Sequence, residues 1–119
     1  MTVRAISRFI YKICPASLWR AAEITGVFRG SAVDAADGFI HFSTAAQAAE
    51  TAAKHFAGQK DLLLVQVESA RLGDRLRFEP SRGGGLFPHL YGDLELAAVS
   101  KVEALPLGPD GRHLFPPLA

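Results

Sequence analysis

The chain has 119 residues, of which 49% are hydrophobic, so a single domain with a buried core is expected over residues 1–119. Its 13 lysines and arginines against 12 acids argue against a broad electrostatic surface for nucleic acid or membrane. The single cysteine, Cys14, excludes an internal disulfide and fits a reducing cytoplasm, and the absence of a long apolar run predicts no membrane-spanning segment.

The first elements of the chain are predicted as a strand followed by a helix. Residues 8–14 alternate and are rich in β-forming side chains, so they predict a strand that ends at Pro15. Residues 16–26 have helical spacing, with Ser17 as the expected N-cap and Gly26 as the stop. After this helix we expect a Gly-, Ser- and Asp-rich loop at 27–38 and a short strand at 39–43.

A second helix should begin at Thr44. Thr44 and Gln47 match the capping box, and an alanine-rich stretch then continues to about Gly58. Residues 61–68 form the strongest strand signal in the chain. Their leucines and valines fall on both faces, which predicts a central strand buried on both sides.

The rest of the chain predicts short strands separated by turns. In order, we expect a turn at 69–74, a strand at 75–79, a glycine-rich loop at 81–85, a strand at 86–92 that Pro88 confines to an edge or bulge, a last strand at 94–105, and an irregular tail from about residue 106. Strands at both ends with two main helices grouped early predict a small α+β fold with a mixed or antiparallel sheet.

Two histidines stand in the same pattern on two predicted strands. Because alternate side chains of a strand share a face, Phe39, His41 and Ser43 point one way, in the order aromatic, imidazole and hydroxyl. Residues 87–91 repeat this order with Phe87, His89 and Tyr91. We therefore expect the two strands to line one cleft, with Tyr11 of the first strand as a further polar aromatic. The alternative is that both histidines are structural.

Other polar residues near these strands have more than one interpretation each. Ser43 and Thr44 serve either as helix caps or, together with free backbone N–H groups of the helix start, as an anion site. Arg82 and the three glycines after it either approach a phosphate or form a flexible hairpin connection, since the Walker pattern is absent. Glu79 is either a general base, an electrostatic partner to a cation, or a solvated strand end.

The other two histidines, and the chance of a metal site, give simpler expectations. His55 should interact with the end of the second helix, and His113 in the tail has no predicted role. His41 and His89 lack a clear third ligand, so no metal is expected.

At these residues the sequence resembles a known family. The stretches "IYKI", "DGFIHFST", "HFAG" and "GLFPHLYG", with Trp19, Gln47 and Glu79, are similar to the bacterial domain of unknown function 952 over nearly the whole chain. Lys12 stands where members of that family often carry histidine. The family is grouped with ADP-ribosyltransferase-like folds, and residues 38–56 also resemble the second motif of RNA 2′-phosphotransferases, with His41 and Ser43 at matching positions.

The resemblance implies a split, mixed β-sheet and a cleft for NAD or an ADP-ribosyl group. His41 and Ser43 would hold ribose, Tyr11 or Tyr91 would stack on a ring, and Lys12, Thr44 or Arg82 would contact the ligand, while His89 or Glu79 would act on the acceptor. The third-motif glutamate of such enzymes has three candidate positions here, namely Glu79, His89 and Glu95.

Three functions follow as hypotheses. The first is an enzyme that cleaves or transfers at a ribosyl bond, with NAD as candidate substrate and an RNA end as candidate partner. The second is a non-catalytic module that binds a nucleotide-like ligand or a protein. The third is a small interaction protein whose histidines bond only to the backbone.

Overall fold

The computed structural model describes residues 7–118, apart from the side chain of Arg82. Its main sheet has the order β1-β4-β8, and β4 runs antiparallel to both neighbours. The strands are β1 (Phe9–Pro15), β4 (Leu62–Glu68) and β8 (Val99–Leu105). The prediction of a central buried strand is confirmed, since Leu62, Leu64 and Val65 of β4 are at most 2% exposed.

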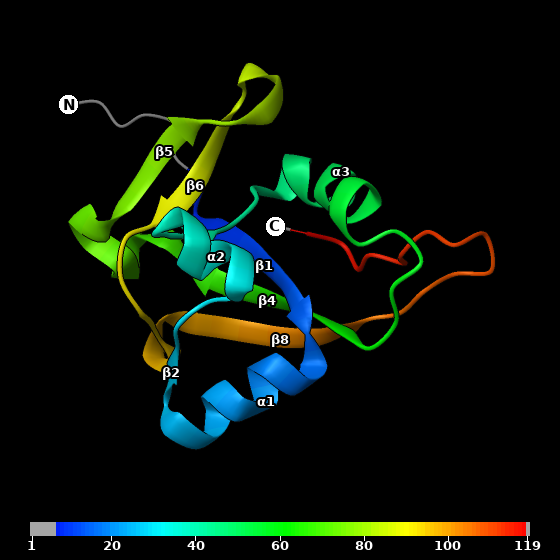
Figure 1. Ribbon diagram of the computed structural model, residues 1–119, viewed down its shortest axis with the longest axis horizontal. Coiled ribbons are helices and arrows are strands. Elements are labelled where there is room, and N and C mark those ends of the chain that lie inside the picture. The colour runs from blue at the N-terminus through cyan, green and yellow to red at the C-terminus, as the bar shows by residue number, and fades with distance from the viewer. Residues whose placement is uncertain (1–6, 119) are drawn as a thin grey trace.

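The two main helices cover opposite faces of this sheet. Helix α1 (Ala16–Thr25) packs Trp19 against the alternate residues Ile10, Cys14 and Val65. Helix α3 (Ala45–His55) packs Ala52 on the other face, against Tyr11, Ile13, Leu62 and Leu64. Figure 1 shows α1 and α3 on the two sides of the strands β1, β4 and β8.

A second, smaller sheet has the order β3-β6-β5 and carries the predicted histidines. Its strands are β3 (Ile40–His41), β6 (Leu86–Leu90) and β5 (Leu76–Pro80). The expectation that Pro88 confines its strand to an edge is wrong, because β6 lies between the other two. Proline is tolerated there because its carbonyl still accepts from the Phe42 N–H at 3.0 Å, so the pairing loses only the N–H that proline does not have.

The pairings between the described strands are all antiparallel, which is one of the two arrangements that the sequence predicted and differs from the mixed sheet that the family resemblance implies. The split into separate sheets is present. The protein is therefore α+β with small antiparallel sheets. The predicted tail is irregular, with one isolated bridge between Leu107 and His113.

The predicted loop at 27–38 contains two elements that the sequence reading missed. Strand β2 (Val27–Phe28) pairs with β7 (Leu94–Glu95), and helix α2 (Ala32–Asp37) follows. A capping box between Ser31 and Asp34 starts α2, and Gly38 ends it. A two-residue strand and a six-residue helix are too short for hydrophobic periodicity to mark them.

Several boundaries differ by a few residues. Ser17 is not an N-cap, because α1 begins at Ala16 directly after Pro15 without a side-chain cap. Gly26 does end α1, in the left-handed conformation with φ of 87°. Helix α3 ends at His55 rather than near Gly58. The remaining turns are η1 (Ser69–Arg75), η2 (Arg82–Gly84) and η3 (Leu96–Ala98), and η3 divides the predicted last strand into β7 and β8.

Within residues 7–118, no helix combines the length and the apolar character that crossing a membrane requires.

Candidate functional site

His41 and His89 lie directly opposite each other on the paired strands β3 and β6. Their ring centroids are 5.6 Å apart. Phe39 stacks on the His89 ring with centroids 4.0 Å apart, and its ring lies 4.6 Å from that of His41. The prediction that the two histidines share one face is confirmed, because alternation places both side chains on the same side of the small sheet.

Both histidines line a cleft of about 760 Å³. Strand β1 forms one wall along residues 11–15, and α2 and α3 supply further walls. The turn between β5 and β6 closes the cleft with Ser81, Gly83 and Gly85. Volumes of this order are typical of sites for small molecules and cofactors.

His89 forms a hydrogen-bonded dyad with Glu79. Its Nδ1 lies 2.7 Å from Glu79 Oε1, and the Tyr91 hydroxyl donates to the same oxygen at 2.7 Å. The hydrogen bonds from His89 and then Tyr91 lower the pKa of Glu79, and the same carboxylate raises the pKa of Tyr91. An ionised Glu79 accepts a hydrogen bond from Nδ1–H, so the lone pair of a neutral His89 is on Nε2. This Nε2 has no partner among the described residues.

His41 is held on both ring nitrogens by carboxylates of α2. Asp34 Oδ1 lies 2.6 Å from Nδ1, and Asp37 Oδ2 lies 2.9 Å from Nε2. Asp34 accepts the hydrogen bond of Nδ1, whereas the contact of Nε2 with Asp37 is an ion-pair distance. His41 is therefore held between two carboxylates, whereas His89 offers a free Nε2 acceptor.

Asp34 connects β1, α2 and β3 through one buried carboxylate. It is 2% exposed and accepts from Lys12 Nζ at 2.9 Å, from the Ser31 backbone N–H at 2.8 Å and from the His41 backbone N–H at 3.1 Å. Burial by itself raises the pKa of Asp34, but the Lys12 ammonium and these hydrogen bonds outweigh it, so the pKa lies below its usual range. Gly30 passes this carboxylate so closely that an added Cβ would lie 2.7 Å from Asp34 Cβ.

The other predicted ligand-binding residues are more enclosed than the sequence suggested. Tyr11 lines the cleft but is 2% exposed, and its hydroxyl donates to Gln66 at 3.0 Å. Lys12 is bound to Asp34 rather than directed to a ligand, and the Ser43 hydroxyl is 2.7 Å from that of Thr51. Tyr91 is 36% exposed beside Phe39, at a ring distance of 5.3 Å.

Thr44 is a helix cap, which is one of the two roles that the sequence allowed for it. The capping box with Gln47 is formed, and the Thr44 N–H donates to Gln47 Oε1 at 3.0 Å. Gln47 Nε2 also donates to the Leu86 carbonyl at 2.8 Å, which fastens the start of α3 to β6. The side chain of Arg82 lies outside the described part of the chain.

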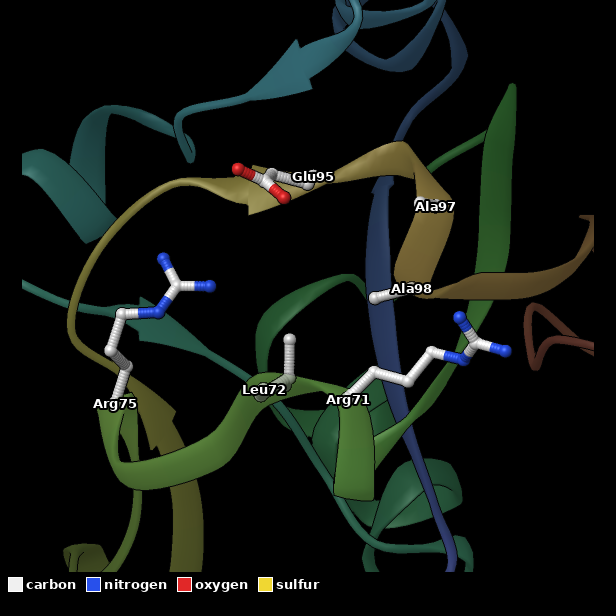
Figure 2. Close-up of a pocket in the computed structure, with 6 residues that line it drawn as sticks. All are labelled: Arg71, Leu72, Arg75, Glu95, Ala97 and Ala98. Carbon is white, nitrogen blue, oxygen red and sulfur yellow. The ribbon is translucent and has the colours of Figure 1, made fainter.

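Glu95, one candidate for the third-motif glutamate, lies in a different pocket. That pocket has a volume of about 170 Å³ and is lined by Arg71, Leu72, Arg75, Glu95, Ala97 and Ala98. Figure 2 shows Arg71 and Arg75 rising from η1 and Glu95 facing them from β7. Glu95 does not line the histidine cleft. Of the other two candidates, His89 lines it, and Glu79 is hydrogen-bonded to His89 without lining it.

Cys14 is also at the cleft wall but is buried, and burial raises the pKa of its thiol to about 11. The thiol therefore stays protonated at neutral pH and is a poor nucleophile. Within residues 7–118, no group of three or more His, Cys, Asp or Glu side chains is placed to hold a metal ion.

Sequence reasoning missed Asp34, Asp37 and the role of Phe39. The signal for Asp34 was present, since Ser31 followed three residues later by an acid matches the start of a capped helix. No local signal links Asp34 to Lys12, because the two are 22 residues apart and meet only in the folded chain.

The chain was compared with known proteins. A family model described as a protein of unknown function, DUF952, matches residues 13–102. The crystal structure of protein CC0527 from Caulobacter crescentus is similar at 51% identity and a TM-score of 0.86, covering 89% of this chain and 93% of that one. The solution structure of CC0527 is similar at 51% identity and a TM-score of 0.81, covering 88% and 90%. No curated protein matches. This chain therefore belongs to the DUF952 family of proteins of unknown function.

Proposed function

We propose that the histidine cleft binds an NAD-type or ADP-ribosyl group and that the protein cleaves or transfers at the ribosyl bond. The observation that carries the proposal is the direct pairing of His41 with His89 in one cleft, each with a ring nitrogen fixed by a carboxylate. Orientation of an imidazole by a carboxylate is the arrangement that general acid–base catalysis uses.

In this proposal His89 is the general base that takes the proton of the acceptor hydroxyl. The bond between ribose C1′ and the nicotinamide nitrogen breaks, and its electron pair leaves with neutral nicotinamide. The ribose passes through an oxocarbenium-like state, as in glycoside cleavage. An acceptor hydroxyl then forms the new bond to C1′, and its proton goes to His89 Nε2. Glu79 keeps His89 in the required tautomer and stabilises the imidazolium that forms.

His41 has a different role, because carboxylates lie beside both of its ring nitrogens. In this proposal His41 binds a ribose hydroxyl and does not take the acceptor proton, which goes to His89. Ser43, which follows two residues later, supports the same wall through its bond to Thr51 rather than by direct contact. The likeness of residues 38–56 to an ADP-ribosyltransferase motif supports this assignment of the cleft.

The second candidate function is a non-catalytic binding module. The lysines of the cleft favour it, because Lys12 is paired with Asp34 and Lys54 with Glu50 at 3.3 Å. The Lys12 ammonium is therefore unavailable to a pyrophosphate without losing a buried partner, whereas the pair of Lys54 and Glu50 is exposed. A ligand held mainly by hydroxyl contacts and by its ring would need neither of them.

Ligand-dependent melting tests the proposal. Wild-type protein is melted alone and with NAD, ADP-ribose or an RNA end that carries a 2′-phosphate. A ligand at a hundred times its dissociation constant stabilises the folded state by about 2.7 kcal/mol. We expect such a shift with NAD or ADP-ribose, and its loss in His41→Ala.

The matched control is His113→Ala, because His113 is outside the cleft and bonds to the Gln59 carbonyl. This variant should keep the full ligand shift. Release of nicotinamide from NAD separates the two candidate functions, since only the enzyme produces it. A melting temperature that none of the three ligands changes would overturn the proposed function.

A further inference from the structure

Where His41 borders the cleft, Asp37 supplies a negative charge beside its ring. The Asp37 side chain is 49% exposed, lines the cleft, and has Oδ2 at an ion-pair distance of 2.9 Å from His41 Nε2. The second carboxylate on this ring, Asp34, is buried behind it and is already bound to Lys12. A ligand that reaches His41 therefore meets a carboxylate beside the imidazole.

Leaving aside the undescribed side chain of Arg82, the cationic groups of residues 7–118 that contact Asp34 or Asp37 already face carboxylates. Lys12 Nζ is 2.9 Å from Asp34 Oδ2 and its side chain is only 8% exposed. The His41 ring already faces two carboxylates, so a phosphate bound beside it would be a third anion around one imidazole. Like charges at such distances repel, and their repulsion is stronger where the site is partly buried.

A hydroxyl has the opposite preference. Carboxylate oxygens accept hydrogen bonds from hydroxyl groups, and Asp37 Oδ1 accepts none from the described residues. In dinucleotide sites of other folds, an acidic residue bonds the ribose 2′-hydroxyl, whereas an arginine accommodates a 2′-phosphate. Asp37 Oδ2 and His41 Nε2 lie 2.9 Å apart, so a carboxylate acceptor and an imidazole stand side by side where the hydroxyls of an unmodified ribose would bind.

We propose that Asp37 is a specificity-determining residue that selects a ribose with free hydroxyls and rejects one that carries a 2′-phosphate. This inference rests on the proposed function, because it assumes that the cleft binds a ribosyl group. It narrows the substrate class to ADP-ribose or an NAD-type dinucleotide, and it excludes the 2′-phosphorylated RNA end from the His41 side of the cleft.

Calorimetric binding of three ligands tests this inference. They are ADP-ribose and its two derivatives that carry a 2′-phosphate on one ribose or on the other. In wild type, we expect the phosphate on the ribose at His41 to weaken binding on the order of tenfold. Asp37→Asn, which removes the charge at nearly constant shape, should bring that ratio close to one, and Asp37→Ser should do the same.

The matched control is Glu50→Gln, which removes a carboxylate from the same cleft without any contact to His41. It should leave the ratio unchanged. If ADP-ribose binds but neither derivative is weakened, or if the weakening persists in both Asp37 variants, the inference is wrong and the proposed function stands. If ADP-ribose does not bind, the proposed function fails and the inference fails with it.

Discussion

Replacing Asp34 with alanine should lower the free energy of unfolding by about 3–5 kcal/mol, because the change leaves a buried ammonium without its partner. Lys12 is 7% exposed and its Nζ lies within 3.1 Å of both Asp34 oxygens. The same change removes the capping partner of the Ser31 N–H and the acceptor of the His41 N–H. Urea unfolding of wild type and Asp34→Ala measures the loss.

The pair of Lys54 and Glu50 provides the exposed comparison. Their side chains are 57% and 67% exposed, so Glu50→Ala should cost no more than about 0.5 kcal/mol. The double variant Lys12→Met, Asp34→Leu should recover part of the loss, since it removes both charges together. A loss below about 1 kcal/mol in Asp34→Ala would contradict the role of Asp34 as the partner of a buried charge.

The same carboxylate makes stability depend on pH in the acid range. Because the pKa of Asp34 is lower in the folded chain than its ordinary value of 3.8, the unfolded chain binds more protons between these two values. The contribution of Asp34 is therefore complete above the ordinary value and is lost as the pH falls through the lowered pKa. Asp34→Ala should flatten this part of the pH profile of stability.

The second large effect is expected at His89. Under the proposed function, His89→Gln should reduce turnover by about 10²–10⁴-fold, because general-base catalysis contributes factors of this size. Glutamine keeps a donor for Glu79 and much of the volume beneath Phe39, so folding should be preserved. The rate of nicotinamide release measures the effect.

Two further variants assign that effect to the dyad. Glu79→Gln should also slow turnover and change its pH profile, because His89 would lose the carboxylate that fixes its tautomer. His55→Gln, in the same cleft but away from the dyad, should have little effect. Turnover of His89→Gln within about twofold of wild type would exclude His89 as the base.

The sequence predicted the paired histidines because strand alternation is a local rule. Placing His41 and His89 in identical aromatic surroundings required only a period of two, and the structure pairs them directly. Gly26 and the capping box of Thr44 with Gln47 were equally local and are confirmed. Such signals involve residues within one turn of each other.

The partners of the histidines could not be predicted in the same way. Asp34 lies in a short helix within a stretch whose composition is typical of loops, and its contact to Lys12 is long-range. The central position of Pro88 depends on the pairing of β6 with both β3 and β5, which no property of residues 86–90 reveals. The antiparallel order β1-β4-β8 likewise results from the packing of distant strands.

The central claim is that the cleft between β1, α2 and the two histidines is the functional site. Titration of ADP-ribose into uniformly ¹⁵N-labelled protein, followed by amide chemical shifts, tests this most directly. If the histidine cleft binds ADP-ribose, we expect saturable shifts concentrated at Ser31–Asp37, His41 and His89, with little change around the separate pocket at Arg71, Arg75 and Glu95. Shifts confined to that second pocket, or the absence of any saturable shift, would contradict the account.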